Sequence, residues 1–161
     1  MAHPDYEELL AAFAVHGVRY LIVGAHAVAF HARPRATKDL DVFVAPTRAN
    51  QARLRAALTD FFGGEPPEYA LGDISSPDTV VQLGVAPVRV DLIFSLEGVP
   101  RFADAWKRRA DARFGAVPAH YLGLSDLVAA KEAANRAIDR ADLAALRRVR
   151  ARTHRRRRPS S

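Results

Sequence analysis

The sequence predicts a single domain of α/β or α+β class, built on a small mixed β-sheet flanked by helices. Several segments carry apolar residues at helical spacing, and short runs rich in β-branched residues lie between them. Glycine or proline closes most of these segments. The 161 residues are 49% hydrophobic and 26% charged, as is typical of one globular domain. We assign residues 1–150 to this domain and 151–161 to a basic tail that we expect to be disordered.

The first half of the chain alternates helices and strands. The expected elements, in order, are a helix over 5–16, a strand over 18–23, a helix over 25–31, a strand over 39–44 and a helix over 47–61. Gly17 and Gly63 are suited to end helices because glycine readily adopts the left-handed conformation. Pro34 prevents the short third element from continuing, since its ring forbids an interior helical position.

The second half begins with a loop over 65–78, which is rich in proline and glycine. The expected elements after it are a hairpin of strands 79–83 and 88–94, a helix over 98–110, a helix over 126–136 capped by Ser125, and a last helix starting at Asp139. Phe102 and Trp106 are four residues apart on one helical face, which indicates core packing rather than base stacking.

The net charge of +6 is concentrated at one end of the chain. From Arg136 onward there are ten arginines and two acids, so the rest of the chain is nearly neutral. One interpretation is a solvated helix end. The other is non-specific contact between this arginine-rich tail and the phosphate backbone of a nucleic acid.

Other classes of protein are disfavoured by what the sequence lacks. It contains no cysteine, which excludes disulfides and thiolate zinc sites, and no apolar run approaches the roughly 18 residues needed to span a bilayer. The first residues lack the basic and apolar regions of a secretory signal. The expected location is cytoplasmic, without membrane contact.

Three carboxylates are expected on one face of the sheet. Side chains alternate faces along a strand, so Asp39 and Asp41 point the same way. In the strand over 88–94, the same alternation places Asp91 on a polar face with Arg89, its simplest ion-pair partner. Burying carboxylates without partners is costly, so the face requires solvent, basic groups or cations. Mg²⁺ suits such a site because it binds carboxylates while accepting substrate phosphates.

Gly24 follows a buried strand and begins a helix. The first backbone N–H groups of a helix are free, and its positive dipole end favours anions. The order of strand, glycine, helix and strand therefore predicts a phosphate-binding turn beside the carboxylates. The plain alternative is an exposed strand face with ordinary acids.

Three short motifs resemble the signature of the polymerase-beta-type nucleotidyltransferase superfamily. They are "VGA" at 23–25, "DLDV" at 39–42 and "VDL" at 90–92. The segments "PRATKDLDVFV" and "KEAANRAIDRADLAALR" are similar to a bacterial branch that includes AbiEii-like and minimal nucleotidyltransferases, many of them associated with toxin–antitoxin or phage-defence loci. The resemblance extends over residues 18–146 and implies a nucleotidyltransferase fold.

This resemblance implies a set of site residues. Asp39, Asp41 and Asp91 would bind catalytic Mg²⁺, with two ions expected, and Asp91 would help to deprotonate an acceptor hydroxyl. The implied nucleotide-binding residues are Gly24, Ala25, Arg35, Thr37, Lys38 and Lys131. Ala25 departs from the family pattern, which has glycine or serine there, so a serine hydroxyl contact with phosphate is lost.

The implied activity is Mg²⁺-dependent transfer of an NMP group from an NTP to a hydroxyl. The preferred acceptors are protein or tRNA, in the setting of a toxin–antitoxin system. The alternative is a catalytically weak relative that serves as a binding module, either for a partner protein or for RNA.

Other polar residues are assigned structural roles. Arg136, Asp139 and Asp142 are expected to cap or pair within the last helices. His26 and His31 are five residues apart and do not share a helical stripe, so they are expected to be structural or to line a substrate site rather than bind metal.

Overall fold

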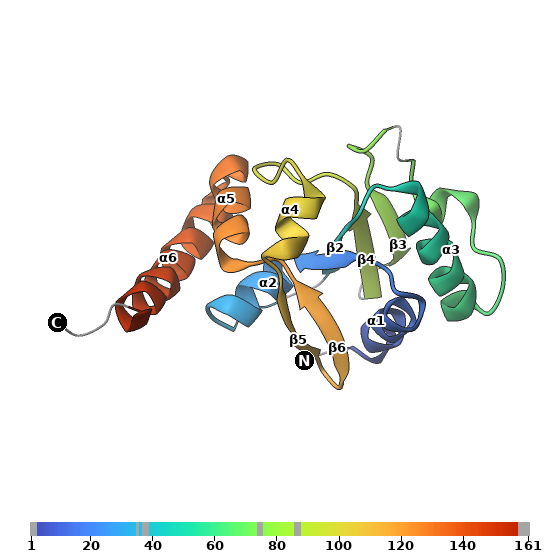
Figure 1. The fold of residues 1–161 in the computed structure, drawn as a ribbon, viewed down its shortest axis with the longest axis horizontal. Helices are drawn as coiled ribbons and strands as arrows, with labels where there is room; N and C mark the ends of the chain where they lie inside the picture. Colours follow the sequence, from blue (N-terminus) through green and yellow to red (C-terminus); the bar gives the residue numbers. More distant parts are fainter. Residues whose placement is uncertain (1–2, 35, 37–38, 74–75, 86–87, 158–161) are drawn as a thin grey trace.

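Six strands form one mixed sheet in the order β3-β4-β2-β1-β6-β5 (Figure 1). This computed structural model describes residues 3–34, 36, 39–73, 76–85 and 88–157. The strands are β1 (Tyr20–Val23), β2 (Asp39–Val44), β3 (Val81–Val85), β4 (Val88–Ile93), β5 (Ala110–Phe114) and β6 (Val117–Tyr121). The pairs β2–β4 and β1–β6 are parallel, whereas β1–β2, β3–β4 and β5–β6 are antiparallel. The predicted mixed sheet is confirmed.

Helices cover both faces of this sheet (Figure 1). The described helices are α1 (Pro4–His16), α2 (Gly24–His31), α3 (Arg48–Phe62), α4 (Phe102–Lys107), α5 (Leu124–Ala134) and α6 (Ala137–Arg157), with a short 3₁₀ turn at Glu68–Leu71. Helices α1 and α3 pack in one hydrophobic cluster with Leu40, Val42 and Val44 of β2. Residues of α2, α4, α5 and α6 form a second cluster with Phe43 of the same strand.

The alternation along β2 therefore sorts its side chains between two cores. Leu40, Val42 and Val44 enter the first core, and Phe43 enters the second. Asp39 and Asp41 share the parity of Phe43, so they lie on the sheet face covered by α2 and α5. A one-residue slip of β2 would move Leu40, Val42 and Val44 out of the first core, so the burial of these side chains fixes the register of the strand.

The helix ends follow the sequence signals in the first half of the chain. Gly17 and Gly63 are left-handed C-caps with φ of +66° and +72°. Thr47 caps α3, since its side chain accepts a hydrogen bond from the Asn50 backbone N–H at 3.1 Å. The buried Asn50 side chain accepts a hydrogen bond from the backbone N–H of Arg19 and donates one to the backbone oxygen of the same residue. The predicted helices over 5–16 and 47–61 are confirmed within one residue.

The second half of the chain differs from the prediction. The helix expected over 98–110 shortens to α4 at Phe102–Lys107, because Pro100 disfavours helical geometry at Val99 and cannot donate a backbone hydrogen bond. Residues 110–121 form the β5–β6 hairpin, for which the sequence predicted no strand. Helix α5 begins after Gly123 rather than at Ser125.

Helix α6 also runs further than expected. Residues 151–157, for which the sequence predicted a disordered tail, continue α6 as a helix with exposed side chains. Arginine is a good helix former, and the helix was already established by Leu143 and Leu146 packing on α5. Among the described residues, no helix combines the length and apolar character needed to cross a membrane.

Candidate functional site

Parallel pairing of β2 with β4 brings the predicted carboxylates together. Asp41 lies directly opposite Asp91, and Asp39 lies opposite Arg89. All four side chains are partly buried, while the alternating residues Leu40, Val90 and Leu92 on the same strands are buried in the first core. The structure therefore confirms that the three acids and Arg89 share one face of the sheet.

Arg89 and Asp91 form a bidentate ion pair. Its Nε donates to Asp91 Oδ1 at 2.9 Å and its Nη2 donates to Oδ2 at 2.8 Å. The same guanidinium lies 3.9 Å from an Asp39 oxygen. The predicted partner of Asp91 is thus confirmed, and one arginine balances part of the charge of three carboxylates.

Gly24 packs directly against Asp41. It starts α2 immediately after β1, and its φ of +64° is a conformation that side-chain-bearing residues rarely adopt. A Cβ atom at this position would lie 2.4 Å from Asp41 Oδ2. Only glycine therefore allows the carboxylate to approach the start of the helix.

The start of α2 supplies the donors expected of a phosphate-binding turn. Val23 is the N-cap residue and no side chain caps the helix, so its first backbone N–H groups have no intrahelical acceptor. Ala25 follows Gly24 in this first turn and contributes its N–H but no hydroxyl. The helix start and the carboxylates are adjacent, as the motif order predicted.

Burial and the two neighbouring carboxylates raise the proton affinity of Asp41. Burial raises the pKa of Asp41 to about 6, with further contributions from the neighbouring charges of Asp91 and Asp39, against the lowering effect of Arg89 and Lys131. Partial desolvation penalises the ionised form, and like charges add to that penalty. A cation bound here would relieve both effects.

A cavity of about 260 Å³ opens over this face. Its polar lining includes Asp41, Asp91, Lys131, Arg136 and Asp139, and its apolar lining includes Val23, Val80, Ile93, Leu96, Leu127 and Ala130. The sequence did not predict the apolar wall from α5 or the contribution of Leu96. Small side chains such as Ala130 and Ala134, on the α5 side that faces the strands, were the available signal.

Lys131 lies in this cavity wall as part of a buried charge cluster. Its Nζ is 3.0 Å from Asp139 and 3.2 Å from Asp142, both of which are fully buried. Arg136 also donates to Asp139 at 2.7 Å, and Arg33 approaches Asp142 at 3.6 Å. The predicted pairing of Asp139 and Asp142 within the last helices is confirmed, and it holds Lys131 beside the carboxylates.

Three predicted nucleotide-binding residues, Arg35, Thr37 and Lys38, lie outside the described residues. The two histidines of α2 lie apart from the carboxylate cavity. His31 bonds the backbone oxygen of Leu122 at 2.7 Å, and burial lowers its pKa. The ring of His26 packs against Tyr6 and Phe114. Neither histidine lines the carboxylate cavity, which agrees with a structural role for both.

Tyr6 adds a contact that the sequence did not indicate. Its hydroxyl donates to the backbone oxygen of Arg89 at 3.1 Å. Burial raises the pKa of Tyr6, and the charges of the three acids raise it further. This bond fixes the strand segment that carries Arg89 from the opposite face of the sheet.

Carboxylate oxygens are suitable ligands for Mg²⁺, but the three carboxylates of this face do not point toward one common position. Asp41 and Asp91 are hard oxygen ligands on paired positions, and Mg²⁺ needs only one or two carboxylates. Among the described residues, however, no group of three or more acidic, histidine or cysteine side chains is arranged to hold a metal ion. Asp91 instead turns toward Arg89.

No family model matches the chain, and the comparison with curated proteins gives no match either.

Proposed function

We propose that the protein is a Mg²⁺-dependent nucleotidyltransferase that transfers an NMP group from an NTP to a hydroxyl acceptor. The observation that carries this proposal is the placement of Asp41 opposite Asp91 with Gly24 packed against Asp41. The three motifs that resemble the polymerase-beta-type superfamily are therefore adjacent in space. Charge repulsion within this group favours a bound cation.

The metal would be held by Asp39 and Asp41, with Asp91 joining when Arg89 releases it. When bound, Mg²⁺ supplies charge neutralisation of the triphosphate and polarises the phosphorus–oxygen bonds. The backbone N–H groups of Gly24 and Ala25 would bind phosphate oxygens at the start of α2. Lys131 would contribute positive potential from the cavity wall, at a position fixed by Asp139 and Asp142.

The proposed reaction is an in-line displacement at the α-phosphorus. The acceptor oxygen forms a bond to this phosphorus, the bond to the bridging oxygen breaks, and pyrophosphate leaves. Asp91 takes the proton from the acceptor hydroxyl. This step requires Arg89 to release at least one of the two Asp91 oxygens to which it now donates. A protein side chain or a tRNA is the proposed acceptor, in a toxin–antitoxin setting.

A second candidate is a nucleotidyltransferase-like binding module without turnover. The bidentate ion pair of Arg89 with Asp91 favours this second candidate, because it keeps the Asp91 carboxylate away from a metal ion shared with Asp39 and Asp41. Ala25 also favours it, since alanine lacks the serine hydroxyl that would bind phosphate. The two candidates differ in whether the α-phosphate of an NTP becomes covalently attached to another molecule.

Transfer of label from nucleotides distinguishes them. The protein is incubated with Mg²⁺, cell lysate and each NTP labelled at the α- or the γ-phosphate. We expect a macromolecule to acquire label from an α-labelled NTP only, since the γ-phosphate leaves with pyrophosphate. Asp39→Asn combined with Asp41→Asn should abolish this labelling without loss of the folded circular-dichroism spectrum. Labelling that survives in the double variant contradicts the proposal.

A further inference from the structure

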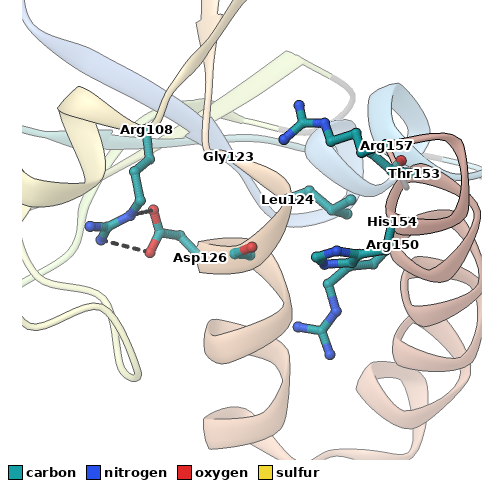
Figure 2. A pocket seen from close by; sticks show the side chains of 9 residues that line it. Arg108, Gly123, Leu124, Asp126, Arg150, Thr153, His154 and Arg157 are labelled. Carbon is teal, nitrogen blue, oxygen red and sulfur yellow. Dashed lines mark hydrogen bonds and ion pairs between the residues drawn. The ribbon is translucent and has the colours of Figure 1, made fainter. Parts of the chain in front are cut away.

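A second cavity lies between the start of α5 and the end of α6, away from the carboxylates. Its volume is about 350 Å³. Because α5 and α6 are antiparallel neighbours, the basic C-terminal half of α6 packs beside the first turn of α5. Figure 2 shows Arg150, His154 and Arg157 extending from α6 into the space beside α5, with the His154 ring between the two guanidinium groups.

The three α6 side chains have a common face. Arg150, His154 and Arg157 are spaced by four and three residues, so they lie on one helical stripe over about 10 Å of helix. Among the described residues, neither Arg150 nor Arg157 has an ion pair or a side-chain hydrogen bond. Their charges are therefore available to a ligand.

The cavity wall opposite α6, formed by Arg108 and the start of α5, carries no unpaired negative charge among the described residues. Arg108 donates two hydrogen bonds of 2.9 Å to Asp126, so this carboxylate does not neutralise the α6 arginines (Figure 2). Helix α5 starts at Gly123 without a side-chain cap, which leaves its first N–H groups directed toward the cavity end of the helix. The cavity thus combines two unpaired guanidinium groups, an imidazole and uncapped backbone donors.

We propose that this cavity binds a phosphate group of a nucleic-acid strand. Guanidinium groups donate paired hydrogen bonds to phosphate oxygens. A strand is favoured over a free phosphate ion because Arg150 and Arg157 are about 10 Å apart along α6, a spacing that suits successive phosphates of a strand better than a single ion. A membrane surface is disfavoured, since residues 147–157 contain no leucine, phenylalanine or tryptophan to enter a bilayer. This inference does not depend on transfer chemistry at the carboxylates.

The test compares two double variants of equal charge. In the cavity variant, Arg150→Gln is combined with Arg157→Gln. In the control, Arg148→Gln is combined with Arg152→Gln, which removes the same charge from α6 positions outside the cavity. Glutamine retains part of the side-chain stem, and melting curves establish that both variants are folded. Binding is measured by fluorescence anisotropy with a labelled single-stranded oligouridylate at several salt concentrations.

We expect the cavity variant to bind the oligouridylate at least about tenfold more weakly, and its salt dependence to fall by about one to two phosphate contacts. The control should lose no more than about threefold. Equal losses in the two variants, or no binding by the native protein, overturn the proposal. Competition by inorganic phosphate as effective as by unlabelled oligouridylate overturns the nucleic-acid source. Tighter binding to phosphatidylserine vesicles than to oligouridylate would assign the surface to lipid and also overturn it.

Discussion

The carboxylate of Asp41 occupies the space that a side chain on Gly24 would need. The backbone of Gly24 is so close to this carboxylate that a Cβ atom on residue 24 would lie 2.4 Å from Asp41 Oδ2. This contact links the turn before α2 to the central strand β2. In the proposed function, the same contact would place a phosphate-binding turn against a metal-binding carboxylate.

Gly24→Ala should disrupt this contact. The substitution combines an unfavourable left-handed conformation with overpacking against Asp41, and overpacking alone typically costs about 1–3 kcal/mol. Gly17→Ala is a matched control, because Gly17 has a similar φ of +66° but open space around its Cβ position. Chemical denaturation should show a larger loss of stability for Gly24→Ala. Equal losses would mean that the contact with Asp41 is unimportant.

Removing Arg89 should expose Asp91 to metal. In Arg89→Gln, the melting temperature without metal should fall, because the three carboxylates lose their nearest cation. The increase in melting temperature caused by Mg²⁺ should be larger than in the native protein. Arg109→Gln provides a comparison, since Arg109 also pairs with an aspartate two residues later, Asp111, on β5. A smaller Mg²⁺ effect in Arg89→Gln than in the native protein would contradict competition between Arg89 and metal.

Lys131 should be essential to stability. Lys131→Met leaves Asp139 and Asp142 buried with one fewer counter-ion, and breaking a buried ion pair typically costs about 3–5 kcal/mol. Arg147→Gln removes an exposed partner of Glu132 and should change stability by less than about 1 kcal/mol. Urea denaturation of both variants checks this. Similar small effects would show that the cluster is effectively solvated.

The raised pKa of Asp41 predicts two pH effects. The folded state binds this proton more tightly than the unfolded chain, whose aspartate pKa is 3.8. The Asp41 contribution to stability therefore declines as pH rises from about 4 to about 6. Asp41→Asn should remove this decline and be more stable than the metal-free native protein near neutral pH. Binding of Mg²⁺ to the native protein should weaken as pH falls through about 6.

Denaturation at a series of pH values, with and without Mg²⁺, measures both effects. An Asp41→Asn variant whose stability parallels the native pH profile would show that Asp41 titrates normally. The comparison with Asp41→Asn is necessary because burial lowers the pKa of His26 and His31. Their contribution has the opposite sign, since stability from neutral buried histidines is lost as pH falls.

The carboxylate face could be predicted from sequence because it follows from the two-residue period of a strand. That period places Asp39 with Asp41 and Arg89 with Asp91, and apolar alternation identifies the strands. The exact register, which sets Asp41 against Asp91, depends on how β4 pairs with β2 and required the structure. The close contact between Gly24 and Asp41 also required it, although the glycine itself was a visible signal.

The β5–β6 hairpin and the basic cavity could not be predicted in the same way. The segment "ADARFGAVPAHY" has weak β-propensity and contains Pro118 of β6, which is tolerated because β6 pairs with β1 only at Tyr121 and not at Pro118. The hairpin is stabilised by pairing with β1 and by Phe114 and Tyr121 in the first core. The cavity depends on the antiparallel packing of α5 and α6, whereas the sequence predicted a disordered tail for residues 151–161, which include His154 and Arg157 of the cavity wall.

Calorimetric titration of the protein with ATP, in the presence and absence of Mg²⁺, shows whether the carboxylate face is a metal-dependent nucleotide site. We expect saturable binding that requires Mg²⁺ and is lost when Asp39→Asn and Asp41→Asn are combined. The control, Asp60→Asn with Asp104→Asn, removes the same charge from surface ion pairs and should bind as the native protein does. Binding that is unaffected by removal of Mg²⁺, or that persists in the Asp39 and Asp41 double variant, would contradict a metal-dependent nucleotide site on this face.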